Sequence, residues 1–119
     1  MSVIKRNSVL IIFLLFPSLS MILSCQEMRK NASKQIQYQQ AQKAHNEGDF
    51  VKAIRIYQKL IVKEPDNEMY VYDLGMAYLD SKDFDNAKEQ IDQLKKMDRE
   101  DLAEKMESYM SEAKGLNNK

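Results

Sequence analysis

One cysteine and one histidine occur among the 119 residues, and they limit the chemistry that the chain could perform. A structural or catalytic zinc ion needs three or four protein ligands at one centre, which these two residues do not supply. His45 follows Ala44 and precedes Asn46 in a polar stretch, a setting typical of a surface histidine near a helix end. The abundant carboxylates show no pair isolated in apolar surroundings that would tune a pKa for acid–base catalysis. We therefore predict no catalytic residue, no metal site and no cofactor.

Residues 1–24 have the layout of an export signal. Lys5 and Arg6 precede eight uninterrupted apolar residues at 9–16, and serines loosen the segment after that. A basic start, a short apolar core and small residues before a cleavage point are typical of secretory signals. The alternative is an uncleaved anchor, because residues 7–26 carry no charge and are long enough to span a bilayer. Both alternatives export the remainder of the chain.

The only cysteine lies where such a signal would be cleaved. The stretch Ile22-Leu-Ser-Cys25 resembles the lipobox of bacterial lipoproteins. That resemblance implies diacylglyceryl attachment to Cys25, cleavage before it and acylation of the new N-terminus. It places the protein at the cell membrane or outer membrane, and Gln26 in place of Asp favours the outer one. A buried, unmodified Cys25 is the remaining alternative.

Charge is balanced overall but not along the chain. The 18 basic and 18 acidic residues give no basic excess, which argues against a nucleic-acid partner. Residues 26–63 hold eight basic and three acidic residues, whereas residues 64–114 hold seven and fifteen. The basic half could contact anionic lipid head groups, or both halves could simply present solvated helix faces.

Beyond a polar tether at 25–34, the apolar spacing is helical throughout. No stretch alternates with the two-residue period of a strand. Asp49, Asp66 or Asn67, and Asp83 are suitable N-caps, and Gly48 and Gly115 suit helix ends. We expect helices near 35–47, after 49, after 67, after 83 and from about 101 to 115.

A shift of 34 residues superimposes matching residue types at matching helical positions. That period is the signature of a helix–turn–helix repeat. The matched pairs are Asp49 and Asp83, Phe50 and Phe84, Ala53 and Ala87, and Leu60 and Leu94.

The chain resembles the tetratricopeptide repeat family at these positions and at Leu74-Gly75, Tyr78 and Pro65. The resemblance implies an all-α fold: a short right-handed α-solenoid with two helix pairs, units 34–67 and 68–101. This domain would follow an N-terminal signal helix and span 35–115, ending with a capping helix at 102–115, and a polar tail would follow at 116–119. Gln37 and Gln40 occupy positions meant for large apolar groups. Since about three repeats are usually needed for stability, we expect a marginally stable domain.

In this family the first helix of each unit lines the concave face, so the resemblance implies partner contacts there. Tyr and Met side chains form an adaptable, semi-apolar surface suited to a peptide or helix. The methionines could instead fill gaps between helices, and that alternative stays open. The Lys and Asn clamp that binds chaperone C-termini is absent. The candidate partner-binding residues are Tyr38, Gln42, His45, Tyr72, Asp73, Met76, Asp80, Met106 and Met110.

The function that this reasoning favours is a non-enzymatic, lipid-anchored adaptor of the bacterial cell envelope. It would bind another envelope protein or peptide segment on the concave face and attach to the membrane through Cys25. The alternatives are a self-associating structural lipoprotein, possible as a homo-oligomer, and a protein with an uncleaved N-terminal anchor. An enzyme or an amphiphile carrier would need a deep pocket, which five short helices can barely form.

Overall fold

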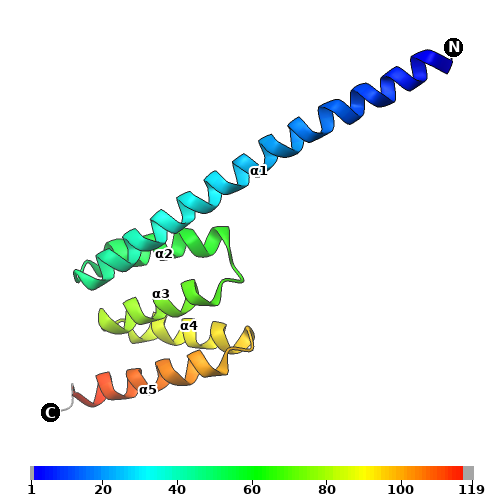
Figure 1. Cartoon of the computed structure of the whole chain (residues 1–119). Helices are drawn as coiled ribbons and strands as arrows, with labels where there is room; N and C mark the ends of the chain where they lie inside the picture. The colour runs from blue at the N-terminus through cyan, green and yellow to red at the C-terminus, as the bar shows by residue number, and fades with distance from the viewer. Residues whose placement is uncertain (1, 117–119) are drawn as a thin grey trace. The chain divides into compact units, whose positions relative to one another are not determined.

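The structure is a computed structural model that describes the backbone of residues 2–116 and the side chains of residues 19–115. Within this range the chain forms helices and no strand, which confirms the predicted all-α fold. The chain divides into residues 1–35 and residues 36–119, and each unit is described by itself. The helices are α1 (Ser2–Asn46), α2 (Phe50–Lys63), α3 (Glu68–Asp80), α4 (Phe84–Lys96) and α5 (Glu100–Leu116) (Figure 1).

The first helix begins far before the expected start near residue 35. Neither Gly nor Pro occurs between Pro17 and Gly48, so nothing in the sequence breaks the helix over the predicted tether. The predicted apolar signal core at 9–16 and the predicted tail at 116–119 lie outside the described side chains. No helix formed by the described residues is long and apolar enough to cross a bilayer. The division into signal and tether stays a prediction.

Side chains in the described part of the first unit are almost all exposed. Leu19, Met21, Ile22 and Leu23 each expose more than half of their surface, and Cys25 is an exposed free thiol. A buried Cys25 is therefore not what the structure contains. This segment has no core of its own.

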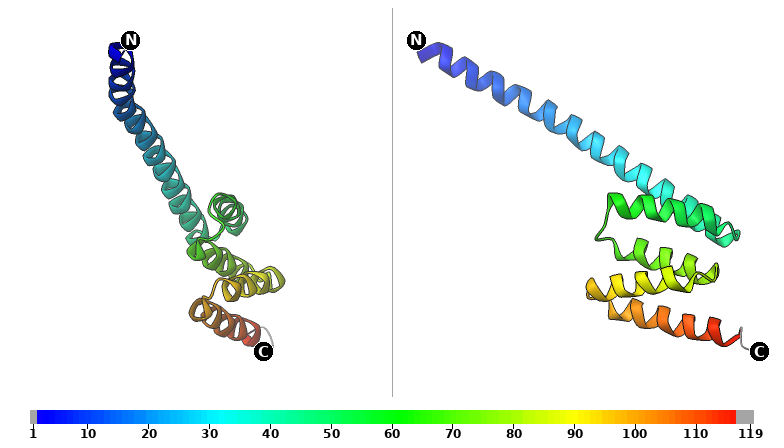
Figure 2. Two further views of the ribbon diagram at one scale, coloured as in Figure 1. Left: turned by 90° about the vertical axis from the view of Figure 1, so that its right-hand side faces the viewer. Right: turned by 180° about the vertical axis from the view of Figure 1, so that it is seen from behind.

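The second unit is a stack of helices in two layers. Turned by 90°, it shows α3 and α5 in one layer and α2 and α4 in the other (Figure 2, left). Small residues at the helix contacts allow the close approach: Ala41, Ala53, Ala77, Ala87 and Ala103 are all fully buried. The arrangement is an all-α solenoid of helical pairs, as predicted.

Three of the sequence-predicted N-caps are formed. The carboxylate of Asp49 accepts the Lys52 N–H at 3.1 Å, and that of Asp83 accepts the Asn86 N–H at 3.3 Å. Asn67, rather than Asp66, caps α3. Each cap satisfies an N–H group that has no partner inside its helix.

Three helices end in the same type of turn, and each turn contains one residue of positive φ. These residues are Gly48 (φ 81°), Lys82 (φ 67°) and Asp98 (φ 56°). In each turn the following N–H donates to a carbonyl five residues back, as in a Schellman motif. Glycine adopts this conformation freely, whereas Lys82 and Asp98 hold it under strain.

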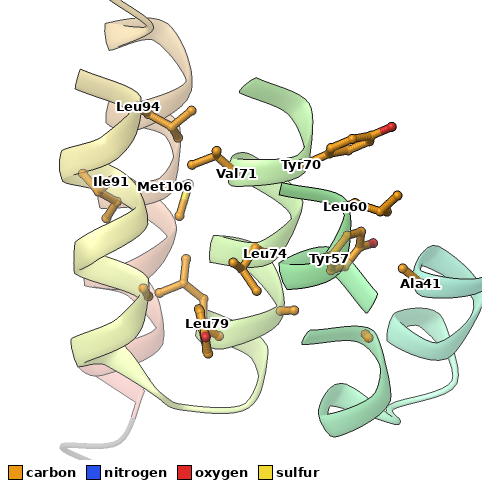
Figure 3. Close-up of a cluster of buried hydrophobic side chains, with 14 of the residues drawn as sticks. Ala41, Tyr57, Leu60, Tyr70, Val71, Leu74, Leu79, Ile91, Leu94 and Met106 are labelled. Atoms are coloured by element: carbon orange, nitrogen blue, oxygen red, sulfur yellow. The ribbon is translucent and has the colours of Figure 1, made fainter. Parts of the chain in front are cut away.

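The buried core repeats with the predicted period. Tyr57 and Leu60 of α2 are fully buried, and so are the residues 34 positions later, Ile91 and Leu94 of α4. Val71 of α3 lies between the two sets in Figure 3. The apolar surface of each pair is thus covered by the next pair, which is how short repeats acquire a core.

The period changes after α4. Phe50 and Phe84 begin α2 and α4 and are 34 positions apart, but Glu68 and Glu100, which begin α3 and α5, are only 32 apart. Helix α4 is one residue shorter than α2, and the α4–α5 loop is one residue shorter than the α2–α3 loop. As a result Met106 of α5, not the residue two positions later, corresponds to the buried Leu74 of α3.

Gly75 of α3 lies in close contact with Met106 of α5. A Cβ atom built on Gly75 would lie 2.1 Å from the terminal methyl of Met106 and 3.1 Å from the Gln90 Cβ. The fully buried Met106 therefore occupies the space that the missing side chain leaves. This explains the Leu-Gly pattern by packing.

Candidate functional site

The helices α1, α3 and α5 are joined by hydrogen bonds on the side that carries the predicted partner-binding residues. The Tyr38 hydroxyl donates to Asp73 Oδ2 at 2.6 Å. His45 Nε2 lies 2.6 Å from Asp80 Oδ2, and the Tyr109 hydroxyl donates to Asp80 Oδ1 at 2.8 Å. Both predicted carboxylates are thus already partnered within the chain.

Asp80 is shared by its two neighbouring helices. One of its oxygens meets His45 of α1 and the other accepts from Tyr109 of α5. The imidazole also meets the Phe50 ring edge-on at 5.7 Å between centroids. His45 therefore connects α1 to α3 and is not an unpartnered imidazole.

Tyr38 belongs to a cluster of tyrosine rings. Its ring lies 6.2 Å from that of Tyr57 and 5.2 Å from that of Tyr70. Burial, followed by the hydrogen bond to the Asp73 carboxylate, raises the pKa of Tyr38. Burial also raises the pKa of Asp73, more than the hydrogen bond from Tyr38 lowers it. Most of the Tyr38 side chain therefore serves packing.

A solvent-open groove of about 330 Å³ runs between α3 and α5. Its lining combines two aromatic rings and a thioether with polar and charged side chains, a mixture common at sites that bind protein segments. We call it the α3–α5 groove. It is lined by Tyr72, Met76, Lys105, Ser108, Tyr109 and Glu112.

The charges around this groove are held in definite places. The Lys105 ammonium lies 5.6 Å from the centre of the Tyr72 ring, within the range of a cation–π contact. The hydrogen bond to the Asp80 carboxylate raises the pKa of Tyr109. The groove thus offers an exposed aromatic ring, a cation and the carboxylate of Glu112 to a bound segment.

The structure brings only part of the predicted set to this groove. Tyr72 and Met76 line it, whereas Asp73 and Asp80 are engaged with neighbouring helices. Gln42 is exposed on α1, and Met110 is half-buried. Met106 has no accessible surface and fills the core.

The sequence predicted a contribution from α5 but placed other residues of that helix at the binding surface. A 34-residue period continued beyond α4 predicts Met106 and Met110 at the groove. The residues of α5 that line it are instead Lys105, Ser108, Tyr109 and Glu112. With the observed shift of 32, Asp73, Met76 and Asp80 correspond to Lys105, Ser108 and Glu112. The short turn at Asp98-Arg99 is the signal that could have revealed the change.

Within the described residues, no three His, Cys, Asp or Glu side chains lie close enough together to hold a metal ion. The arrangement on this side consists of hydrogen bonds, edge-on and tilted ring contacts and the α3–α5 groove. Such a surface can bind a polypeptide segment by packing and hydrogen bonding.

Comparison with known families identifies the family of the repeats. A family model described as tetratricopeptide repeat matches residues 37–104, which include α2, α3, α4 and the groove residues of α3. Neither the curated proteins nor the solved structures contain a significant match to the chain.

Proposed function

The chain belongs to the tetratricopeptide repeat family, a non-catalytic fold whose repeats generally mediate protein–protein interactions, and on this premise we propose a specific adaptor role. The protein is a lipid-anchored adaptor of the bacterial cell envelope that binds a segment of another envelope protein. The segment lies in the α3–α5 groove, and the membrane is reached through Cys25.

The observation that carries the binding site is the α3–α5 groove itself. Tyr72 and Tyr109 present aromatic surface from two different helices, and Met76 adapts to the shape between them. Aromatic residues concentrate binding energy at protein interfaces. The hydrogen bond from the Tyr109 hydroxyl to Asp80 holds the helices α3 and α5 in register before a partner arrives.

The exposed apolar residues of the first unit support the membrane attachment. Leu19, Ile22 and Leu23 have no covering partner among the described residues, and they lie directly before Cys25. A bilayer or a signal-processing enzyme would cover them. Several acyl chains give stable anchoring where a single chain binds only marginally.

Site-specific photo-cross-linking tests the binding site. A benzophenone amino acid at Met76 should capture a discrete envelope protein, whereas the same probe at Asp92 on the outer side of α4 should not. The captured segment, made as a peptide, should then bind the purified protein, and Tyr72→Ala should weaken it roughly tenfold or more. Capture from both positions, or unchanged peptide binding by Tyr72→Ala, would contradict the proposal.

Labelling with a fatty-acid analogue tests the anchor. Cys25→Ala should abolish incorporation of the label and leave the signal unprocessed. Ser24→Ala, which keeps a small residue before the cysteine, serves as the matched control and should be labelled normally. Unchanged membrane retention and unchanged processing of Cys25→Ala would favour the uncleaved anchor instead.

A further inference from the structure

The outward side of α2 is basic and partly apolar. Helix α2 contains four cationic residues and no Asp or Glu. Five of its residues form the surface that we call the outward face of α2: Val51, Lys52, Arg55, Lys59 and Val62.

No residue of this face is covered or neutralised within the part of the chain that the structure describes. Val51 and Val62 are 69% and 84% exposed, unusual for branched apolar residues. Lys52, Arg55 and Lys59 are exposed and take part in no salt bridge among residues 19–115. The fourth cation, Lys63, donates to Gln37 and lies at the edge.

The equivalent face of α4 shows that the fold does not require this composition. Thirty-four positions after Val51, Arg55 and Val62 stand Asp85, Glu89 and Lys96. Those residues are also exposed and polar, and α4 carries as many carboxylates as cations. The two helices bury the same residue pattern, so the difference between their outward faces does not come from packing.

We propose that the outward face of α2 docks on the anionic surface of a phospholipid bilayer. Exposed cations next to exposed apolar side chains suit the boundary between head groups and acyl chains. A second copy of this chain is a poorer occupant. Its acidic helix is α5, with five carboxylates and two cations, and two of those carboxylates, Asp101 and Glu107, are already paired with Arg99 and Lys95.

This inference rests on the proposed membrane attachment. Two valines and three cations give weak, salt-sensitive attraction, which would not hold a freely diffusing protein at a membrane. A chain attached through its N-terminal segment is already confined next to the surface, so its local concentration there is high. Docking of α2 would then orient the domain relative to the bilayer.

The chain contains no tryptophan, so a single introduced tryptophan reports on one position. The full chain with Val62→Trp, reconstituted into vesicles, should show emission shifted to shorter wavelength when phosphatidylglycerol is added to phosphatidylcholine. Access of acrylamide to this indole should fall severalfold. Raising the ionic strength to about 1 M, where the screening length is about 3 Å, should reverse both changes.

Two matched controls come from α4. Lys96→Trp places the reporter at the equivalent, exposed position and should not respond to phosphatidylglycerol. In the Val62→Trp background, Arg55→Glu/Lys59→Glu should abolish the response, whereas Lys88→Glu/Lys96→Glu changes the net charge equally and should preserve it. Thermal unfolding of each variant checks that the fold is retained.

Flotation on phosphatidylcholine alone separates this inference from the proposed attachment. If the Val62→Trp chain floats but its emission ignores phosphatidylglycerol, the docking of α2 is overturned and the attachment stays intact. A chain that does not float overturns both. If the emission of Val62→Trp shifts with rising protein concentration in the absence of vesicles, the outward face of α2 binds a second copy instead. Equal responses of Val62→Trp and Lys96→Trp to phosphatidylglycerol would show that α2 has no specific role.

Discussion

The helical pair α1–α2 and the pair α3–α4 share their N-caps and the positions of their buried residues but not their outward surfaces. Asp49 and Asp83 cap α2 and α4 in the same way, and Ala53 and Ala87 are both fully buried. Outside, Val51 of the first pair corresponds to Asp85 of the second. Positions that packing and capping constrain thus recur every 34 residues, whereas exposed positions that no packing constrains differ between the pairs. The differing positions are therefore where a function specific to this chain should be sought.

The largest expected effect tests whether the two pairs are equivalent inside. Ala53→Glu and Ala87→Glu should each lower the free energy of unfolding by roughly 2–5 kcal/mol, because each buries a charge and overpacks a helix contact. Denaturant titration measures both. Val51→Glu, at an exposed position, is the control and should stay within about 0.5 kcal/mol of the parent. A near-neutral result at either alanine would break the equivalence.

A second change extends the comparison to α5. Met106→Ala should lower the free energy of unfolding by about 2–3 kcal/mol, because it empties the space next to Gly75. The peptide captured by the α3–α5 groove should still bind the folded variant. Met110→Ala, at a half-buried position, should cost less. Loss of binding without loss of stability in Met106→Ala would place Met106 at the surface after all.

The helix-ending turns differ between the pairs by one residue type. Gly48→Ala should destabilise by about 1 kcal/mol, because it forces a Cβ into the left-handed region. Lys82→Gly should stabilise by a similar amount of about 0.5–1 kcal/mol, since it relieves that strain. Thermal unfolding measures both shifts. Effects of the same sign would show that the two turns are not equivalent.

The smallest effect concerns the loops between layers. Pro65 lies in the α2–α3 loop, whereas Arg99 in the α4–α5 loop binds Asp101 at 2.9 Å and also contacts Glu68. The Arg99 guanidinium lowers the pKa of Asp101 to about 2, from about 3.9 in an unfolded chain. The stabilisation is therefore present above about pH 4 and is lost as the pH falls towards about 2.

Asp101→Asn should accordingly make the stability fall less steeply over this acidic range, as measured by urea titration at several pH values. Asp85→Asn, an exposed residue in the first turn of α4, is the matched control. An unchanged pH profile for Asp101→Asn would mean that solvent screens the pair completely.

Most of the fold could be predicted because its signals are local. Four helix boundaries could be predicted to within about two residues. Their signals are the carboxylates of Asp49 and Asp83, the glycine at 48 and the apolar spacing. The start of α1 could not be predicted from the polar stretch before residue 35. This stretch contains no Gly or Pro to end a helix, and it shows no clear apolar period to indicate one. The strained turns at Lys82 and Asp98 also lack a residue type that announces positive φ.

The site was only partly predictable, because it depends on register between helices. Tyr72 and Met76 follow from the pattern of one helix, and both line the groove. The positions of Lys105 and Tyr109 depend on where α5 begins. Helix α5 begins two residues earlier than a 34-residue period predicts, because α4 and the α4–α5 loop are each one residue shorter than their counterparts. Gln37, predicted as a defect in the core, is half-buried and accepts a hydrogen bond from Lys63.

The carboxylate of Asp80 touches both neighbouring helices, His45 on one side and Tyr109 on the other. Such a bridge sets the curvature of the surface in the free protein. An incoming peptide then loses its own freedom on binding, but the receptor has little left to lose, and the entropic cost of association falls mainly on the guest.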